Sequence, residues 1–283
     1  MPVIISGGQE ADTISKHVFG LSFTVMDLNG LKVVEASVEQ EFPDMPTPRY
    51  LHQSVKIGTD LFVFGGKNSP TDINALNSVF KLRIHELVSK EPHKAAKDIN
   101  WKECAPMKSA RCLFASIVID EKFVYVYGGI SGSSNKRPTL SETAFERYDV
   151  VANLWTDLVV ENAPRLSAFG WTRGDDEHEM FILGGSDGGN LQSSLWSFDL
   201  KKLRATNLNI EYESATGLNK MAAIKDPKTG AYKIHSFGGS QSNGASYWVK
   251  LNQEKPEWKV HESSYLSLVG SSLENNLLFN QSI

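Results

Sequence analysis

The sequence predicts an all-β protein, a β-propeller built from four-stranded antiparallel blades. Three observations support this prediction: five Gly-Gly pairs each follow a short strand-like run, these five pairs recur at a near-constant spacing, and an arginine precedes three of the runs. The first glycines of successive pairs lie 58, 63, 56 and 54 residues apart. A near-constant period of this length indicates repeated units that stack on one another. The pairs are Gly7-Gly8, Gly65-Gly66, Gly128-Gly129, Gly184-Gly185 and Gly238-Gly239.

Each repeat is expected to form four short strands separated by turn residues. Arg49, Arg111 and Arg165 each precede a first strand, and the first glycine follows 16, 17 and 19 residues later. That distance suits one strand, a tight turn and a second strand. A third strand is clearest at residues 145–149 and 195–200. A tryptophan marks the fourth strand in three units, as Trp101, Trp155 and Trp258.

This combination of motifs resembles the Kelch repeat family, within the superfamily of galactose oxidase-like central propellers. Kelch blades carry Gly-Gly after the second strand, then a spaced tyrosine and tryptophan, and an arginine that opens the next unit. The best copy here runs from Arg111 to Arg165, with Gly128-Gly129, Tyr148 and Trp155 in register. The resemblance covers about residues 2–262. It weakens where the fourth strand of one unit lacks tryptophan and where the last unit begins without an arginine.

The repeated glycines and aromatic residues have a structural explanation that needs no ligand. Glycine allows positive φ and close backbone packing, which a side chain would prevent. Tyrosine and tryptophan are large enough to fill the wedge between neighbouring blades. We therefore expect Tyr148, the three tryptophans and the five glycine pairs to form the framework of the ring.

We expect residues 1–283 to form one propeller domain, with five blades favoured over six. The expected blade units are 1–48, 49–110, 111–164, 165–218 and 219–262, followed by 263–283 as a closing strand and tail. The chain opens on a second strand, so the first blade lacks its innermost strand. Residues 263–270 could supply that strand, which would close the ring by pairing the two ends of the chain. In the alternatives, residues 276–281 begin a sixth blade, or a partner chain completes the ring.

Composition narrows the classes of partner. The 283 residues carry a formal net charge of -4, which favours neither nucleic acid nor an anionic membrane. No apolar run reaches the roughly 18–20 residues that a membrane-spanning helix needs. The N-terminal residues do not resemble a signal peptide, and the two cysteines, Cys104 and Cys112, are too few for a disulfide framework. We expect both thiols to be buried and reduced, and the protein to be cytoplasmic.

Strand order predicts one binding face. The first two strands of a blade are antiparallel, so the start of the first and the loop after Gly-Gly lie at the same end. In the Kelch family this face often binds peptide segments of partner proteins, so the resemblance implies protein partners. The arginines expected on this face suggest an acidic peptide segment as one such partner. The expected contact residues are Lys67, Lys136, Arg137, Asp187, Arg49, Arg111 and Arg165.

The three arginines have two interpretations. Their guanidinium groups could capture the carboxylates of an acidic peptide, because arginine forms planar bidentate contacts with carboxylates. Alternatively, each could join neighbouring blades, and their recurrence with the repeat favours this role. Lys67, Lys136 and Arg137 lie outside the repeated pattern and are the better candidates for partner-specific contact.

We find no convergent catalytic set, no His/Cys cluster with metal-ligand spacing and no cofactor-binding motif. The sequence therefore favours a non-catalytic interaction module without a cofactor, an adaptor or a subunit of a larger assembly. The alternative is a carbohydrate enzyme similar to the sialic acid mutarotases, which are Kelch-like propellers. One of the three arginines would then bind the carboxylate of the sugar, and His52 or an acidic neighbour would act as the acid or base, although His52 also fits a structural role.

Overall fold

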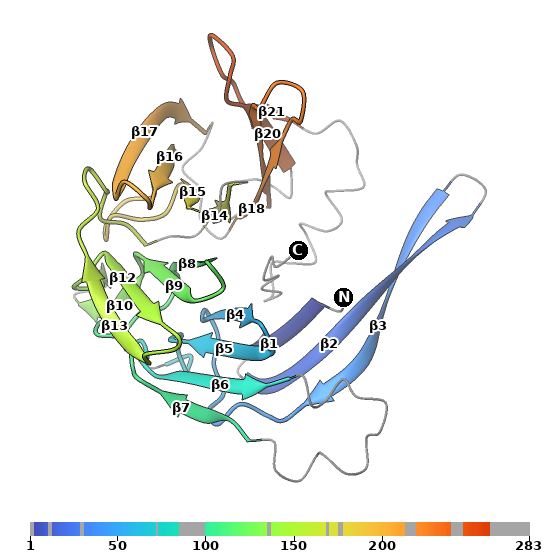
Figure 1. Cartoon of the computed structure of the whole chain (residues 1–283), viewed down its shortest axis with the longest axis vertical. Helices are drawn as coiled ribbons and strands as arrows, with labels where there is room; N and C mark the ends of the chain where they lie inside the picture. The colour runs from blue at the N-terminus through green and yellow to red at the C-terminus, as the bar shows by residue number, and fades with distance from the viewer. Residues whose placement is uncertain are drawn as a thin grey trace.

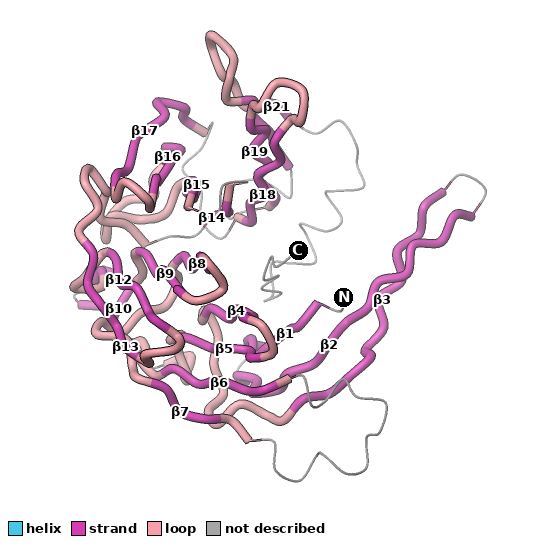
Figure 2. Tube along the Cα trace, in the orientation of Figure 1, coloured by secondary structure: helices cyan, strands magenta, loops and turns pink. Residues whose placement is uncertain are grey.

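The computed structural model describes residues 3–10, 13–28, 31–71, 73–84, 100–134, 137–167, 170–174, 178–212, 219–238 and 246–260. Five antiparallel sheets follow one another around an arc, which confirms the prediction of a five-bladed all-β propeller (Figure 1). The described residues form strands, turns and loops, and no helix is present among them (Figure 2). Consequently, none of them lies in a helix that is long and apolar enough to span a membrane.

Four of the five sheets have four strands, in the order expected for propeller blades. Blade 2 contains β4 (Gln53–Ile57), β5 (Asp60–Phe64), β6 (Val79–Arg83) and β7 (Lys102–Cys104). Blade 3 contains β8 (Ala115–Ile119), β9 (Phe123–Tyr127), β12 (Phe145–Asp149) and β13 (Leu154–Leu158). Blade 4 contains β14 (Gly170–Arg173), β15 (Glu179–Leu183), β16 (Ser194–Asp199) and β17 (Arg204–Glu211). Blade 5 contains β18 (Lys220–Lys225), β19 (Tyr232–Phe237), β20 (Ser246–Lys250) and β21 (Lys259–Val260).

Blade 1 has three described strands: β1 (Val3–Glu10), β2 (Thr13–Leu28) and β3 (Leu31–Phe42). The Gly7-Gly8 pair lies within β1, so this strand corresponds to the second strand of the other blades. β2 and β3 form a hairpin much longer than the other blade strands, and it extends beyond the ring in Figure 1. The expected closing strand, residues 263–270, lies outside the described residues.

The central strands of blades 2, 3 and 4 are apolar on both faces because each of these blades packs between two others. In β9, Val124 and Val126 face blade 2, whereas Tyr125 and Tyr127 face blade 4. Four apolar clusters of this kind join blades 1 and 2, 2 and 3, 3 and 4, and 4 and 5. The core of the molecule is therefore a series of layers between blades. Removing this apolar area from water drives the stacking.

The expected framework aromatics lie in these layers. Trp155 is buried between blades 2 and 3, stacks on Tyr148 at 4.9 Å and donates a hydrogen bond to the Ala105 carbonyl at 2.8 Å. Trp101 packs between blades 1 and 2, and Trp258 between blades 4 and 5. Each tryptophan thus covers apolar area that belongs to two blades.

The glycine pairs join consecutive blades. Gly7, Gly65, Gly128, Gly184 and Gly238 all have φ between +57° and +70°, a conformation that favours glycine. The amide of the second glycine donates to a carbonyl of the following unit, as from Gly8 to Arg49 at 3.0 Å and from Gly66 to Arg111 at 2.9 Å. Gly239 lies outside the described residues.

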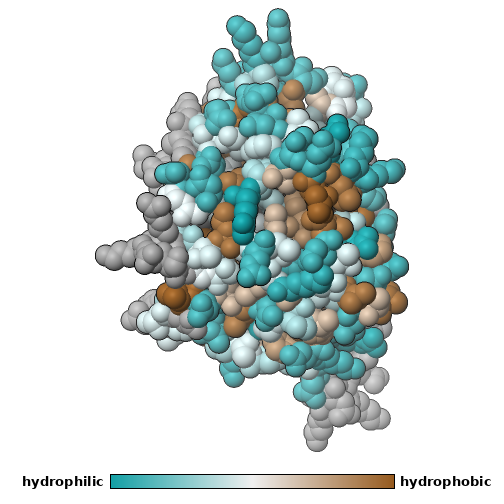
Figure 3. Space-filling model, turned by 90° about the vertical axis from the view of Figure 1, so that its left-hand side faces the viewer, coloured by the Kyte–Doolittle hydropathy of each residue, from teal (hydrophilic) through white to brown (hydrophobic). Residues whose placement is uncertain are grey.

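The outer side of blades 3 and 4 is mainly hydrophilic, with small apolar patches between polar side chains (Figure 3). The exposed apolar residues of blade 3 are Val151, Leu154 and Val159, which lie along β13 and its two ends. Scattered exposed apolar residues are common on soluble proteins and carry no functional assignment here.

Candidate functional site

The loops that follow three Gly-Gly pairs contact one another and form a continuous surface, which we call the loop face. It comprises residues 67–78 of blade 2, 130–140 of blade 3 and 186–193 of blade 4, without residues 72, 135 and 136, which are not described. The amide of Ala75 donates to the Ser131 carbonyl at 2.8 Å, which joins the first two loops. Gly188 of the third loop lies so close to Pro138 that a Cβ atom would be 3.3 Å from its carbonyl oxygen.

The middle loop of this surface is a small hairpin. β10 (Ile130–Ser134) pairs with β11 (Arg137–Leu140), outside the four-stranded sheet of blade 3. The hairpin is anchored by Cys112, whose amide and carbonyl pair with Ile130 at 2.9 Å. A hydrogen-bonded hairpin holds its residues in place better than an irregular loop, so the centre of the loop face is built on an ordered element.

A pocket of about 700 Å³ opens on this face between blades 3 and 4. The β11 end of the hairpin forms one wall, the loop after β15 forms the other, and an arginine lies between them. The lining residues are Pro138, Thr139, Leu140, Arg165, Asp187, Gly188, Gly189 and Asn190. This combination of an apolar side chain, backbone groups and a cation suits a short peptide segment.

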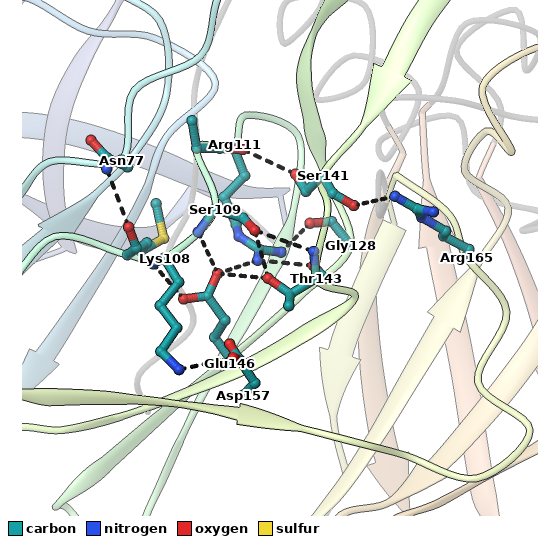
Figure 4. A network of polar contacts seen from close by, with 12 residues as sticks. Asn77, Lys108, Ser109, Arg111, Gly128, Ser141, Thr143, Glu146, Asp157 and Arg165 are labelled. Atoms are coloured by element: carbon teal, nitrogen blue, oxygen red, sulfur yellow. Dashed lines mark hydrogen bonds and ion pairs between the residues drawn. The ribbon is translucent and has the colours of Figure 1, made fainter.

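Arg165 is the cation of this pocket. Its side chain is exposed, and one guanidinium N–H donates to the Ser141 carbonyl of blade 3 at 2.9 Å (Figure 4). The bond orients the guanidinium group across the junction between the two blades. Arginine carries five N–H donors, so this bond leaves donors that could contact a carboxylate in the pocket.

Asp187 shapes the pocket wall. Its carboxylate accepts hydrogen bonds from the amides of Asn190 at 2.8 Å and Gly189 at 3.0 Å, and from the Gln192 side chain at 3.1 Å. The two amide bonds, that of Asn190 first, hold the pKa of Asp187 below its ordinary value. The carboxylate is thus occupied by its own loop, and Arg165 is the cation among the residues that line the pocket.

Two exposed apolar side chains lie on the loop face. Ile73 in the blade 2 loop is 51% exposed, and Leu191 in the blade 4 loop is 38% exposed. The sequence analysis did not select either residue, nor Leu140. These residues could have been found in the sequence as large apolar residues within otherwise polar loops. Exposed apolar residues of this kind suggest contact with a partner.

Arg49 and Arg111 lie inside the blades instead of on the loop face, so they are removed from the set of partner contacts. Both side chains are fully buried. Arg49 donates to the Gly65 carbonyl at 2.9 Å and to the Thr47 hydroxyl at 2.8 Å, and it stacks on Phe80. Burial lowers the pKa of Arg49 to about 10, so it stays charged at neutral pH. A partner cannot reach either guanidinium group in this structure.

Arg111 is the centre of the polar network in Figure 4. It donates to Glu146 at 2.5 Å and to the carbonyls of Thr143, at 3.0 Å, and Gly128. Glu146 is also fully buried and accepts the amides of Lys108 at 2.7 Å and Ser109 at 3.0 Å. The network joins the segment that enters blade 3 to the second and third strands of that blade. The role of Arg111 is therefore structural, but its side-chain bonds lie within blade 3 and do not join neighbouring blades, as its recurrence had suggested.

The remaining predicted contact residues are placed only in part. Lys67 is half-buried on the loop face, where its backbone pairs with Tyr50. Lys136 lies outside the described residues. Arg137 is described as the first residue of β11, but its side chain is not described. The structure therefore brings Arg165 and Asp187 together at one pocket and places Lys67 on the same surface.

The pairing of Arg49 with His52 does not form an accessible site. His52 is buried, and its Nε2 atom lies 2.9 Å from the Ser6 hydroxyl oxygen of blade 1. Burial and the nearby Arg49 charge lower the pKa of His52 to about 3. A neutral, enclosed imidazole next to a buried arginine fits the structural role of His52 better than binding of a sugar acid.

Other chemistry-bearing residues form no additional site in the described part of the chain. Cys104 and Cys112 are free and buried, and burial raises the pKa of the Cys112 thiol to about 11. A buried thiol with this pKa is largely protonated and therefore a poor nucleophile. No group of three His, Cys, Asp or Glu side chains among the described residues is close enough to hold a metal ion.

The sequence of the chain is similar to those of known Kelch proteins. It is 26% identical to human Kelch-like protein 33 over 175 residues, which cover 61% of this chain and 29% of the relative. It is 28% identical to Kelch-like protein 25 of Xenopus laevis over 151 residues, 50% of this chain and 22% of the relative. The Drosophila melanogaster homologue of leucine-zipper-like transcriptional regulator 1 is 25% identical over 162 residues, 55% of this chain and 15% of the relative. The chain thus matches less than a third of the length of these relatives, and no family model matches it.

Proposed function

We propose that this chain, a Kelch-type five-bladed β-propeller, is a non-catalytic protein-interaction module that binds its partner through the loop face. Its role would be that of an adaptor or a subunit of a larger assembly. The similarity to Kelch-like proteins and the propeller fold support protein binding in general. The choice of face rests on the geometry of the loops.

The observation that carries the proposal is the pocket between blades 3 and 4. Exposed Arg165 lies there between an ordered hairpin and a loop that Asp187 holds in shape. Ile73 and Leu191 offer apolar area on the same loop face. An acidic peptide segment with a neighbouring apolar residue matches this arrangement, since it would pair a carboxylate with Arg165 and cover exposed apolar area.

The proposal is tested by affinity capture from native extract with the wild-type chain and two charge-reversed variants. Arg165→Glu changes the pocket, whereas Lys201→Glu changes an exposed lysine in the turn between β16 and β17, at the opposite end of blade 4. We expect a stable set of partners with the wild type and with Lys201→Glu, and its loss with Arg165→Glu. Thermal unfolding of both variants checks that the fold is intact.

Recovery of the same partners by both variants would contradict the assignment of the loop face. Once a partner segment is identified, its acidic residues can be changed to the matching amides. If Arg165 pairs with one of these carboxylates, its change to the amide should weaken binding by about tenfold or more, since close charge pairs at interfaces couple by about 1.5 kcal/mol or more.

A further inference from the structure

The hairpin on the loop face carries a threonine that follows two consecutive cations. The sequence reads Lys136-Arg137-Pro138-Thr139-Leu140, and no Asp or Glu occurs between Lys122 and Ser141. Protein kinases distinguish their substrates by the charges that surround the hydroxyl group. A kinase with an acidic substrate groove selects a threonine with cations two and three residues before it. The two cations lie outside the Kelch repeat, so the repeat does not account for them.

Thr139 is accessible to an enzyme. It lies in β11 and is exposed. Its carbonyl accepts a hydrogen bond from the Ser131 hydroxyl at 3.2 Å, whereas its own hydroxyl has no hydrogen-bond partner among the described residues. β11 pairs only with β10, in a two-stranded sheet outside blade 3. This extended segment at the margin of the fold can therefore be bound without opening a blade.

Arg165 lies close to Thr139. Both residues line the pocket of about 700 Å³ between blades 3 and 4. One guanidinium N–H of Arg165 donates to the Ser141 carbonyl at 2.9 Å (Figure 4). Ser141 follows Thr139 by two residues, which is at most about 7 Å along an extended chain. The guanidinium group is thus fixed beside the segment that carries the threonine.

A phosphate group on Thr139 would find a suitable partner in this pocket. Phosphothreonine carries a charge of about −1.5 to −2 at pH 7 and three strong acceptor oxygens. Arg165 keeps N–H donors beyond the bond to Ser141, and arginine binds phosphate through two parallel hydrogen bonds. Asp187 is the acidic residue of the lining, and its carboxylate is bonded to the amides of Gly189 and Asn190.

We propose that Thr139 is phosphorylated by a protein kinase that selects basic substrates, and that the phosphate pairs with Arg165 and occupies the pocket. In the transfer, a bond forms between Thr139 Oγ1 and the γ-phosphorus of ATP as the bond from this phosphorus to the β–γ bridging oxygen breaks. ADP leaves, and the hydroxyl proton passes to the catalytic carboxylate of the kinase.

Phosphorylation should switch partner binding off, and this consequence rests on the proposed function. The phosphate would engage the cation of the pocket and repel an acidic peptide segment, because like charges placed together at an interface oppose binding. The modification and the pairing with Arg165 do not depend on the proposed function, so they can be tested without a partner.

Phosphorylation of the folded full chain tests the site. We expect ATP and the catalytic subunit of cyclic-AMP-dependent kinase to modify Thr139, as located by mass spectrometry. The double variant K136E/R137E should be modified at Thr139 at least about tenfold more slowly. The matched control K201E/K202E reverses two exposed charges at the opposite end of blade 4 and should be modified as the wild type is. Modification of Thr139 only after denaturation, or equal rates for the two double variants, would overturn the site.

A phosphorus NMR titration of the modified chain tests the pairing. The phosphothreonine resonance is identified by its absence from Thr139→Ala. The second pKa of this phosphate is ordinarily about 6 and should be lower in the wild type, because a nearby guanidinium group favours the doubly charged form. Arg165→Gln should return the pKa towards about 6. The control Arg173→Gln, which removes an exposed arginine at the other end of β14, should not. The same pKa in all three chains would contradict the pairing.

Partner binding separates this inference from the proposed function. With a captured partner, the phosphorylated wild type should bind at least about tenfold more weakly than the unmodified chain. Thr139→Ala treated with the kinase should bind as the unmodified chain does. Unchanged binding after complete phosphorylation would overturn the regulation. A chain without partners whose phosphate has a lowered pKa would support the site and the pairing and would contradict only the proposed function.

Discussion

At the scale of single residues, the repeated arginine is kept buried by different neighbours in different blades. Arg49 and Arg111 both donate to the carbonyl of the first glycine of their own blade. The second residue of the third strand differs, since it is Glu146 in blade 3 and Phe80 in blade 2. Arg111 therefore pairs with a carboxylate, whereas Arg49 stacks on an aromatic ring. The geometry that the two blades share is the bond to the glycine carbonyl.

Removing the Glu146 carboxylate should destabilise the protein strongly. Glu146→Ala leaves the Arg111 charge buried without its partner, together with two backbone amides, and should lower the free energy of unfolding by about 3–5 kcal/mol. Chemical denaturation measures the change. The control is Glu161→Ala, which removes an exposed pair with Arg204 and should cost less than about 1 kcal/mol. Equal effects of the two variants would contradict a role for burial.

His52 should make stability depend on pH. Its pKa is about 3 in the folded state, against an ordinary value of 6.5, so the unfolded chain binds a proton that the folded chain excludes between these limits. Stability is therefore unaffected above about pH 7 and lost as pH falls through this window, by up to about 1.4 kcal/mol per pH unit. The difference in unfolding free energy between wild type and His52→Gln should shrink or reverse on acidification. A difference that stays constant from pH 7 to pH 4 would contradict this prediction.

At the scale of elements, the second glycine of a pair determines how closely the end of the second strand approaches the segment that enters the first strand of the same blade. Gly185 has φ of +100°, and a Cβ atom at this position would overlap the carbonyl oxygen of Ser167. The amide of Ser167 in turn donates to the Ser186 carbonyl at 2.8 Å. The pair thus ends the second strand and docks it on the segment that enters the first strand of its own blade. Both requirements, positive φ and absence of a side chain, select glycine.

Gly185→Ala should therefore lower the free energy of unfolding by more than the strain of its backbone conformation alone. We expect a loss of about 2–4 kcal/mol in the free energy of unfolding, because the overlap with Ser167 forces the two segments apart. Gly230→Ala is the matched control: φ is +68°, but nothing lies within 4 Å of the new methyl group. Its cost should be about 1 kcal/mol, from backbone strain alone. Similar costs for both variants would show that close packing at Gly185 is unimportant.

At the scale of the whole molecule, four junctions between blades are apolar and the two end blades carry opposite charge. The apolar layers hold blades 1 to 5 in series. Surface charge adds little to stability but contributes strongly to association and to the choice of partner. Closure of the ring by residues 263–270 stays a prediction, since these residues are not described.

The architecture could be predicted from one sequence, because the repeat is local chemistry copied at a near-constant period. The third strand expected at residues 145–149 is β12, with the same bounds, and the run 195–200 overlaps β16. Gly-Gly pairs and strand-like runs depend on neighbouring residues, so no second sequence is needed to recognise them. The position of the loop face also followed from strand order alone.

Which side chains are available on that face could be learned only from the folded ring. Three arginines at equivalent places in the repeat were indistinguishable in the sequence, yet Arg49 and Arg111 are buried and Arg165 is exposed. Whether a guanidinium group reaches solvent depends on residues far along the chain, such as Ser78 and Glu146, that fold back around it. The hairpin β10–β11 and the pocket beside it depend on contacts between blades for the same reason. Burial depends on how the whole ring packs, so a local sequence pattern cannot predict it.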